Sequence, residues 1–191
     1  MHGNRHFVLA LAGALCLTSL APAWAADVPG LSNLIELLRP PGDRGSQGFS
    51  TTAPTTSRAR PVADDAASRT TAPSGVAAAA LALPFQSGSA VLTPDAEKFL
   101  EALGQVLNST ELSRYRFRIE GHTDTTGEAP ANLALSSRRA ATVRQHLISR
   151  HGVAPSRLES LGLGETQLLV ETPDATAEPL NRRVQIVNLG G

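Results

Sequence analysis

Residues 115–150 read YRFRIEGHTDTTGEAPANLALSSRRAATVRQHLISR, and this stretch predicts a strand, a loop and a helix in that order. Apolar and charged side chains alternate over 115–120, which is typical of a strand with one solvated face. A polar loop spans 121–130, and apolar side chains then recur at helical spacing over 131–150, before His151 and Gly152 end the helix. This strand–loop–helix unit is the centre of the predicted fold.

Further elements flank this unit on both sides. Residues 81–85 predict a short buried strand, and the Thr-Pro-Asp of 93–95 starts a helix with an N-cap, a first-position proline and a first-turn acid. Residues 158–163 and 184–189 predict two more strands. The order β-α-β-α-β-β predicts an α+β fold, a two-layer sandwich with the helices packed on one face of a mixed sheet. We place this domain at residues 80–191.

The first 25 residues are typical of a signal peptide. A weakly basic start precedes the apolar stretch 7–20, and Ala-Trp-Ala at 23–25 fits a small-x-small cleavage site. The alternative is an uncleaved anchor, although 7–20 is shorter than the roughly 20 residues that a spanning helix needs. Leu15 before Cys16 argues against a lipid anchor. Cleavage would remove the only Cys, so the mature chain would have no thiol, and no later stretch predicts an integral membrane segment.

Residues 26–79 predict a linker rich in Pro, Thr and Ala, because they contain too few large apolar side chains to offset the entropy of ordering. One apolar island, residues 31–38, interrupts it with leucines at helical spacing. Two interpretations stay open for this island: a stray apolar patch, or a short helix that docks on a partner in the cell envelope.

The charge balance excludes two classes of partner. The chain has 17 basic and 17 acidic side chains, so its formal net charge is zero. Nucleic-acid binders and proteins that adhere to anionic membranes need a positive field. Lys98 is the only lysine, which leaves almost no candidate for a lysine nucleophile. Any recognition of a charged ligand must therefore depend on a local cluster of charged side chains and not on the net charge of the chain.

Polar side chains gather between residues 121 and 139. Asn132, Ser136 and Arg139 are spaced by four and three residues, so they share one helix face beside the loop that carries Asp124. A cleft between this helix face and the loop would bind a zwitterion, with Asp124 accepting an ammonium and Arg139 holding a carboxylate. From spacing alone, a plain Asp124–Arg139 salt bridge that ties the loop to the helix is the favoured alternative.

Four motifs in a fixed order make the chain resemble the OmpA-like C-terminal domain over about residues 81–189. That domain also occurs in the peptidoglycan-associated lipoprotein and in flagellar stator proteins. The motifs are Gly121-His122-Thr123-Asp124-x-x-Gly127, Asn132-x-x-Leu135-Ser136-x-x-Arg139, Gly162-x-Gly164-Glu165 and Asn181-Arg182-Arg183-Val184.

The resemblance implies non-covalent binding of peptidoglycan through the diaminopimelate of its stem peptide. It assigns the ammonium of the ligand to Asp124 and the carboxylate to Arg139, with Asn132 lining the pocket and Arg182 reaching it from the last strand. The implied location is the periplasm, associated with the cell wall, at the inner face of the outer membrane. An alternative function is that of a structural subunit of an envelope machine, such as a motor, secretion or pilus apparatus.

Some residues depart from the family or invite other chemistry. Residues 86–89 read Gln-Ser-Gly-Ser, where many members carry Asp and Asn near the ligand, so a neutral amide or a backbone group would make the contact here. We expect Arg183 to point away from Arg182, as neighbours on a strand do. His122 is expected to brace its loop, and the glycines of the motifs to serve turns. We expect no enzyme, metal or cofactor, because no three-ligand set and no nucleophile beside a base is evident.

Overall fold

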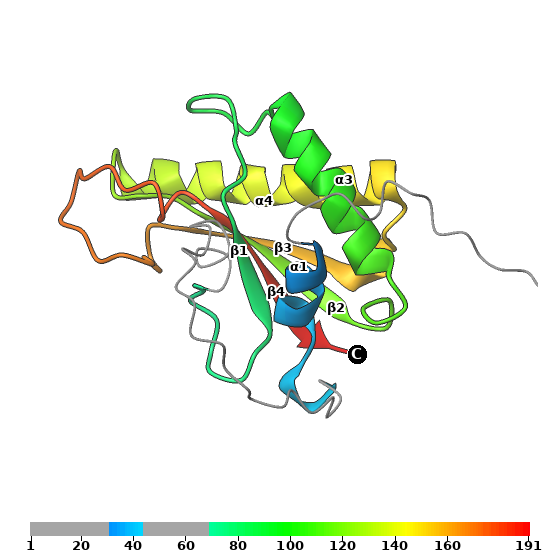
Figure 1. The fold of residues 1–191 in the computed structure, drawn as a ribbon. Helices are drawn as coiled ribbons and strands as arrows, with labels where there is room; N and C mark the ends of the chain where they lie inside the picture. Colours follow the sequence, from blue (N-terminus) through cyan, green and yellow to red (C-terminus); the bar gives the residue numbers. More distant parts are fainter. Residues whose placement is uncertain (1–30, 44–68) are drawn as a thin grey trace, which may run out of the picture.

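The computed structural model describes residues 31–43 and 69–191 (Figure 1). The predicted signal peptide and residues 26–30 and 44–68 of the predicted linker lie outside the described residues. In chain order, the helices and strands are α1 (Leu31–Leu38), β1 (Ala78–Leu81), α3 (Pro94–Asn108), β2 (Arg116–His122), α4 (Ala129–His151), β3 (Leu158–Gly164) and β4 (Val184–Gly190). Two short 3-10 helices lie at Pro41–Asp43 and Pro155–Arg157.

The strands form one four-stranded sheet in the order β1-β4-β2-β3. Strands β2 and β3 are parallel, because α4 connects them as a crossover, and the other two pairs are antiparallel. The sheet is therefore mixed. Together with the helices, it confirms the predicted α+β class and its order of elements.

The helices cover one face of the sheet. Phe117 and Ile119 of β2 are fully buried on that face and belong to the same core cluster as Leu100 of α3 and Leu147 of α4. Alternate residues of β2 face the other side, where Arg118 forms an ion pair with Glu120. The two-residue alternation in the sequence of β2 thus corresponds to one apolar and one polar face.

The first strand lies earlier in the chain than predicted. Strand β1 is Ala78–Leu81 instead of 81–85, and Phe85 makes only an isolated bridge with Leu92. Alanine has a weak preference for strands, so the run of alanines gave no strand signal, and Pro84 has no N–H for a ladder. The ordered domain consequently begins before residue 80. Thr71 already contacts it, because its N–H donates to Gln185 Oε1 at 3.0 Å.

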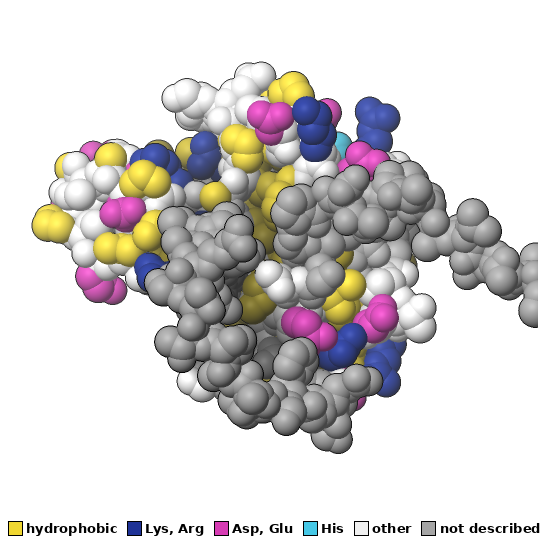
Figure 2. Space-filling view, in the orientation of Figure 1, with side chains coloured by type: hydrophobic (Ala, Val, Ile, Leu, Met, Phe, Trp, Pro, Cys, Tyr) yellow, Lys and Arg dark blue, Asp and Glu magenta, His cyan; other side chains and the backbone are white. Residues whose placement is uncertain are grey.

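Helix α1 packs on the domain of its own chain, next to α3, β1 and β4 (Figure 1). Leu34 and Leu38 are buried in the common core, and Asn188 Nδ2 donates to the carbonyl of Leu38 at 2.8 Å. In the region of α1, Figure 2 shows acidic and basic side chains close together on the surface. An ion pair between Asp43 and Arg114 holds the segment that follows the helix.

Two glycines let α4 approach the sheet closely. A Cβ on Gly121 of β2 would lie 2.3 Å from the carbonyl oxygen of Ser136, and one on Gly162 of β3 would lie 2.4 Å from the amide nitrogen of Ser137. We had expected turns at these positions, but both residues lie inside strands. Their role is to bring the first turns of α4 against the end of β2.

Candidate ligand-binding site

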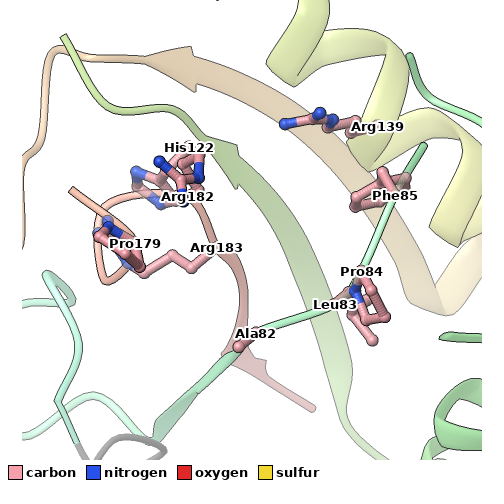
Figure 3. Close-up of a pocket in the computed structure, with 9 residues that line it drawn as sticks. All are labelled: Ala82, Leu83, Pro84, Phe85, His122, Arg139, Pro179, Arg182 and Arg183. Atoms are coloured by element: carbon pink, nitrogen blue, oxygen red, sulfur yellow. The ribbon is translucent and has the colours of Figure 1, made fainter. Parts of the chain in front are cut away.

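A cavity of about 240 Å³ lies where β2 ends and β4 begins. One wall is apolar and comes from the segment after β1, and the remainder is rich in arginine. Figure 3 shows Arg139 on one side of the cavity, with Arg182 and Arg183 on the other. The lining residues are Ala82, Leu83, Pro84, Phe85, His122, Arg139, Pro179, Arg182 and Arg183.

Arg139 reaches the cavity from the third turn of α4. Its Nε donates to the carbonyl of Ser89 at 2.9 Å, and its guanidinium carbon lies 4.9 Å from the centre of the Phe85 ring. Burial lowers the pKa of Arg139, nearby Arg182 lowers it further, and Asp124 partly opposes both. The segment 86–89 thus contributes a backbone carbonyl that orients Arg139, and the exposed Gln86 does not line the cavity.

Asp124 follows β2 and is only 3% exposed. Its Oδ2 accepts from Arg182 Nη1 at 2.6 Å and from the N–H of Glu178 at 3.3 Å, while Oδ1 accepts from the backbone and the hydroxyl of Thr126. Burial raises the pKa of Asp124, but the bonds from Thr126, Arg182 and Glu178 outweigh it and lower the pKa below its usual range.

The carboxylate of Asp124 is therefore neutralised by Arg182 rather than by Arg139. The Asp124–Arg139 salt bridge that spacing alone favoured is absent from the ion pairs of the structure. Arg139 faces the cavity without a carboxylate partner within 4 Å in the described part of the chain. Asp124 itself is not a lining residue, but it contacts Arg182, which is one.

Asn132 is buried beneath the loop and does not line the cavity. Its Nδ2 lies 3.3 Å from the carbonyl oxygen of Asp124, 3.0 Å from that of Thr126 and 2.7 Å from Glu165 Oε2. Asn132 therefore does not line this cavity in the structure, and the ligand role that the resemblance implied for it stays a prediction. The side chain instead fastens the loop that carries Asp124 to the start of α4.

Arg183 lines the same cavity as Arg182, contrary to our expectation that it points away. The alternation of side chains applies within a strand, and β4 begins only at Val184. His122 also lines the cavity and is 1% exposed. The sequence reasoning missed both residues as cavity residues, although the doubled arginine of the Asn-Arg-Arg motif was a signal for Arg183.

Within residues 31–43 and 69–191, no group of three His, Cys, Asp or Glu side chains could hold a metal ion. Over the same ranges, no helix has the length and apolar character needed to cross a membrane.

The mixed sheet and its helices define a small α+β domain, with an arginine-lined cavity at the end of a central strand as the candidate binding site. The chain belongs to the OmpA family, because residues 84–182, more than half of its 191 residues, match that family. The resemblance inferred from the four motifs is thereby confirmed.

Two relatives match this chain over only part of their own length. The peptidoglycan-associated lipoprotein of Mesorhizobium japonicum is 36% identical over 107 residues, which are 56% of this chain and 61% of the lipoprotein. Outer membrane porin F of Pseudomonas aeruginosa is 39% identical over 67 residues, which are 35% of this chain and 19% of the porin. This chain therefore spans less than two thirds of either relative.

Two solved structures share the fold. A MotB-like protein of Desulfovibrio vulgaris is 28% identical with a TM-score of 0.50, covering 60% of this chain and 73% of its own. The cell wall anchor of the T6SS from Pseudomonas aeruginosa is 25% identical with a TM-score of 0.51, covering 60% of this chain and 81% of its own. None of these four names describes an enzyme.

Proposed function

We propose that this protein binds peptidoglycan non-covalently and anchors an envelope protein or complex to the cell wall, without catalysing a reaction. The observation that carries the proposal is the arginine-lined cavity, which Arg139 faces without a carboxylate partner among the residues that the structure describes. Membership of the OmpA family and the names of the relatives support it. The proposed location is the periplasm, against the wall and at the inner face of the outer membrane, after removal of residues 1–25.

The proposed ligand is the free end of diaminopimelate in a stem peptide, which carries a carboxylate and an ammonium on one carbon. Arg139 receives the carboxylate, because its guanidinium is already oriented by Ser89. The ammonium goes to Asp124, whose Oδ2 now accepts from Arg182. The side chain of Arg182 is 45% exposed, so it can leave Asp124 and bind the incoming carboxylate instead. Ligand binding is thus an exchange of ion-pair partners.

The expected affinity for a single stem is modest. A few charge-assisted hydrogen bonds of about 1.5–3 kcal/mol each, less the costs of association, lead to micromolar or weaker binding. Many domains on one polymer would be retained far more strongly. A lysine-type stem lacks the second carboxylate and would leave Arg139 desolvated without an anion, so diaminopimelate is preferred.

Sedimentation with purified sacculi tests the proposal. Arg139→Ala and Asp124→Ala should abolish co-sedimentation, while their urea midpoints show that the domain still folds. Arg116→Ala is the matched control, because Arg116 is exposed at the start of β2 and pairs with Glu159. If both cavity variants sediment with sacculi as the unchanged protein does, the site assignment is wrong.

A second candidate function is that of a structural subunit of an envelope machine, with wall binding as one task. The similarity to the T6SS cell wall anchor favours it. Because Leu34 and Leu38 are buried in the domain, a partner that binds residues 31–38 would use the exposed side of α1, with Asn33 and Glu36. A photo-crosslinker at Glu36 should then trap an envelope protein, whereas one at exposed Glu97 of α3 should not.

A further inference from the structure

Arg183 is buried and forms no ion pair with a carboxylate in the described part of the chain. It is 5% exposed, yet within the described part of the chain no carboxylate lies within 4 Å of its guanidinium. Its donors meet neutral acceptors: Nη2 contacts Thr71 Oγ1 at 3.0 Å and the carbonyl of Gln167 at 3.2 Å. The Nε–H has no acceptor among the described residues.

Burying a guanidinium among neutral acceptors costs free energy unless an anion binds beside it. Desolvation of a charge is compensated in proteins by pairing, and a buried cation with only neutral acceptors is undercompensated. Burial lowers the pKa of Arg183 to about 10, and nearby Glu120 only partly opposes this shift. Arg183 therefore stays protonated at neutral pH. Glu120 is committed elsewhere, because Arg118 lies 2.7 Å from Oε1 and Gln185 donates to Oε2 at 3.1 Å.

The three arginines that line the cavity also carry more positive charge than a single bound carboxylate would neutralise. Arg139 lies on one side, and Arg182 and Arg183 lie on the other (Figure 3). Among the described residues, Asp124 is the carboxylate that pairs with one of these arginines within 4 Å, namely Arg182. His122 also lines the cavity: its ring is 1% exposed, Nε2 lies 3.8 Å from Glu120 Oε2, and neither ring nitrogen has a hydrogen-bond partner among the described residues.

We propose that Arg183 forms a second anion subsite in this cavity, which receives a second carboxylate of the ligand. The inference rests on the proposed function and deepens it, because it specifies a dicarboxylate ligand. Diaminopimelate has two carboxylates: one beside the free ammonium, for Arg139, and one in the main chain of the stem, for Arg183. The subsite favours stems whose main-chain carboxylate is free and disfavours stems in which that group is an amide.

The experiment is a calorimetric titration of the full chain with two synthetic probes. The first is a stem tripeptide that ends in meso-diaminopimelate with a free main-chain carboxylate, and the second is its main-chain carboxamide. The unchanged protein should bind the first at least about tenfold more tightly, because one charge-assisted contact is lost in the second. In Arg183→Gln, this ratio should fall to about one, with the amide bound as tightly as by the unchanged protein.

Controls separate a ligand contact from a structural role. Arg118→Gln alters a cation on the polar face that is paired with Glu120 and should keep the tenfold ratio. If Arg183→Gln does not fold, as its urea midpoint would show, Arg183→Lys replaces it and should retain a reduced preference for the free acid. A purely structural tie between Thr71 and Gln167 would lower stability and leave the ratio unchanged.

The outcomes also distinguish this inference from the proposed function. Equal binding of both probes by the unchanged protein, with both lost in Arg139→Ala, would refute the second subsite and leave wall binding standing. A preference for the acid that persists in the Arg183 variant would refute the role of Arg183. Binding of neither probe would refute both proposals.

Discussion

The two ends of the sheet differ in the side chains that gather there: one end is packed with apolar side chains, and the other carries a cluster of charged ones. At one end, where β1 begins and β4 ends, α1 adds Leu34 and Leu38 to the core and leaves Glu36 exposed. At the other end, where β2 stops, three arginines surround a cavity and Asp124 is held by hydrogen bonds. The comparison shows that apolar packing, which stabilises the fold, is separated from the unpaired charge that a binding site needs.

Gly121 lies near the end of β2 that borders the cavity, where α4 packs directly against the strand, so its substitution should have the largest effect. Gly121→Ala places a Cβ 2.3 Å from the Ser136 carbonyl oxygen, and the backbone of α4 must move. We expect a loss of at least about 3 kcal/mol in the free energy of unfolding, together with weaker sacculus binding. Urea denaturation measures the first quantity. Gly42→Ala, where nothing lies within 4 Å, is the control and should be near neutral. An equally stable Gly121→Ala would refute the close contact.

Leu38→Ala should destabilise the packing of α1 at one end of the sheet and leave the cavity at the other end unchanged. Removing this fully buried side chain should cost about 2 kcal/mol of unfolding free energy. The cost is expected to stay near that value because the short helix can undock when its contacts weaken. Binding to sacculi should not change. Glu36→Ala, on the exposed side of α1, should shift the urea midpoint negligibly. Reduced wall binding in a folded Leu38→Ala would show that the two ends are coupled.

Asn132→Ala should loosen the polar end without removing a ligand contact. The carbonyl oxygens of Asp124 and Thr126 would lose their amide donor, which should cost about 1 kcal/mol. Affinity for the stem tripeptide should fall, because the loop that positions Asp124 becomes more mobile. Calorimetry and urea denaturation on the same variant test this. A loss of affinity with no loss of stability would instead indicate that Asn132 contacts the ligand.

The smallest effect should come from pH. Burial lowers the pKa of His122, and Glu120 partly opposes the shift. The unfolded chain therefore takes up this proton at a higher pH than the folded one. Stability is fully present above the ordinary histidine pKa of about 6.5 and falls below it, by no more than about 1.4 kcal/mol per pH unit. Between pH 7.5 and 5.5, the urea midpoint should fall more for the unchanged protein than for His122→Gln. Equal falls would contradict a buried neutral ring.

Periodic side chains made the centre of the fold predictable. The alternation over 115–120 and the helical spacing over 131–150 correspond to β2 and α4, because each pattern records which face is buried. Strand β1 was misplaced because alanines carry no such record. The close contact at Gly121 was also not foreseen, since a glycine in a strand does not reveal what lies against it.

The sequence predicted which residues gather at the candidate site better than it predicted which of them form an ion pair. Asp124, Arg139 and Arg182 lie near one another at one end of the sheet, as the motifs suggested, but the structure pairs Asp124 with Arg182. Which cation a carboxylate selects depends on chain paths over 58 residues of separation. Sequence spacing resolves only neighbours on one helix or strand, so the positions of Asn132 and Arg183 needed coordinates.

The bond between Asp124 and Arg182 also has a consequence for the response to ionic strength. In the proposed complex, this internal ion pair breaks as ligand pairs form, so its loss offsets one of the electrostatic gains that added salt screens. Added salt should therefore weaken attachment less than it would in a domain whose aspartate has no internal partner to release.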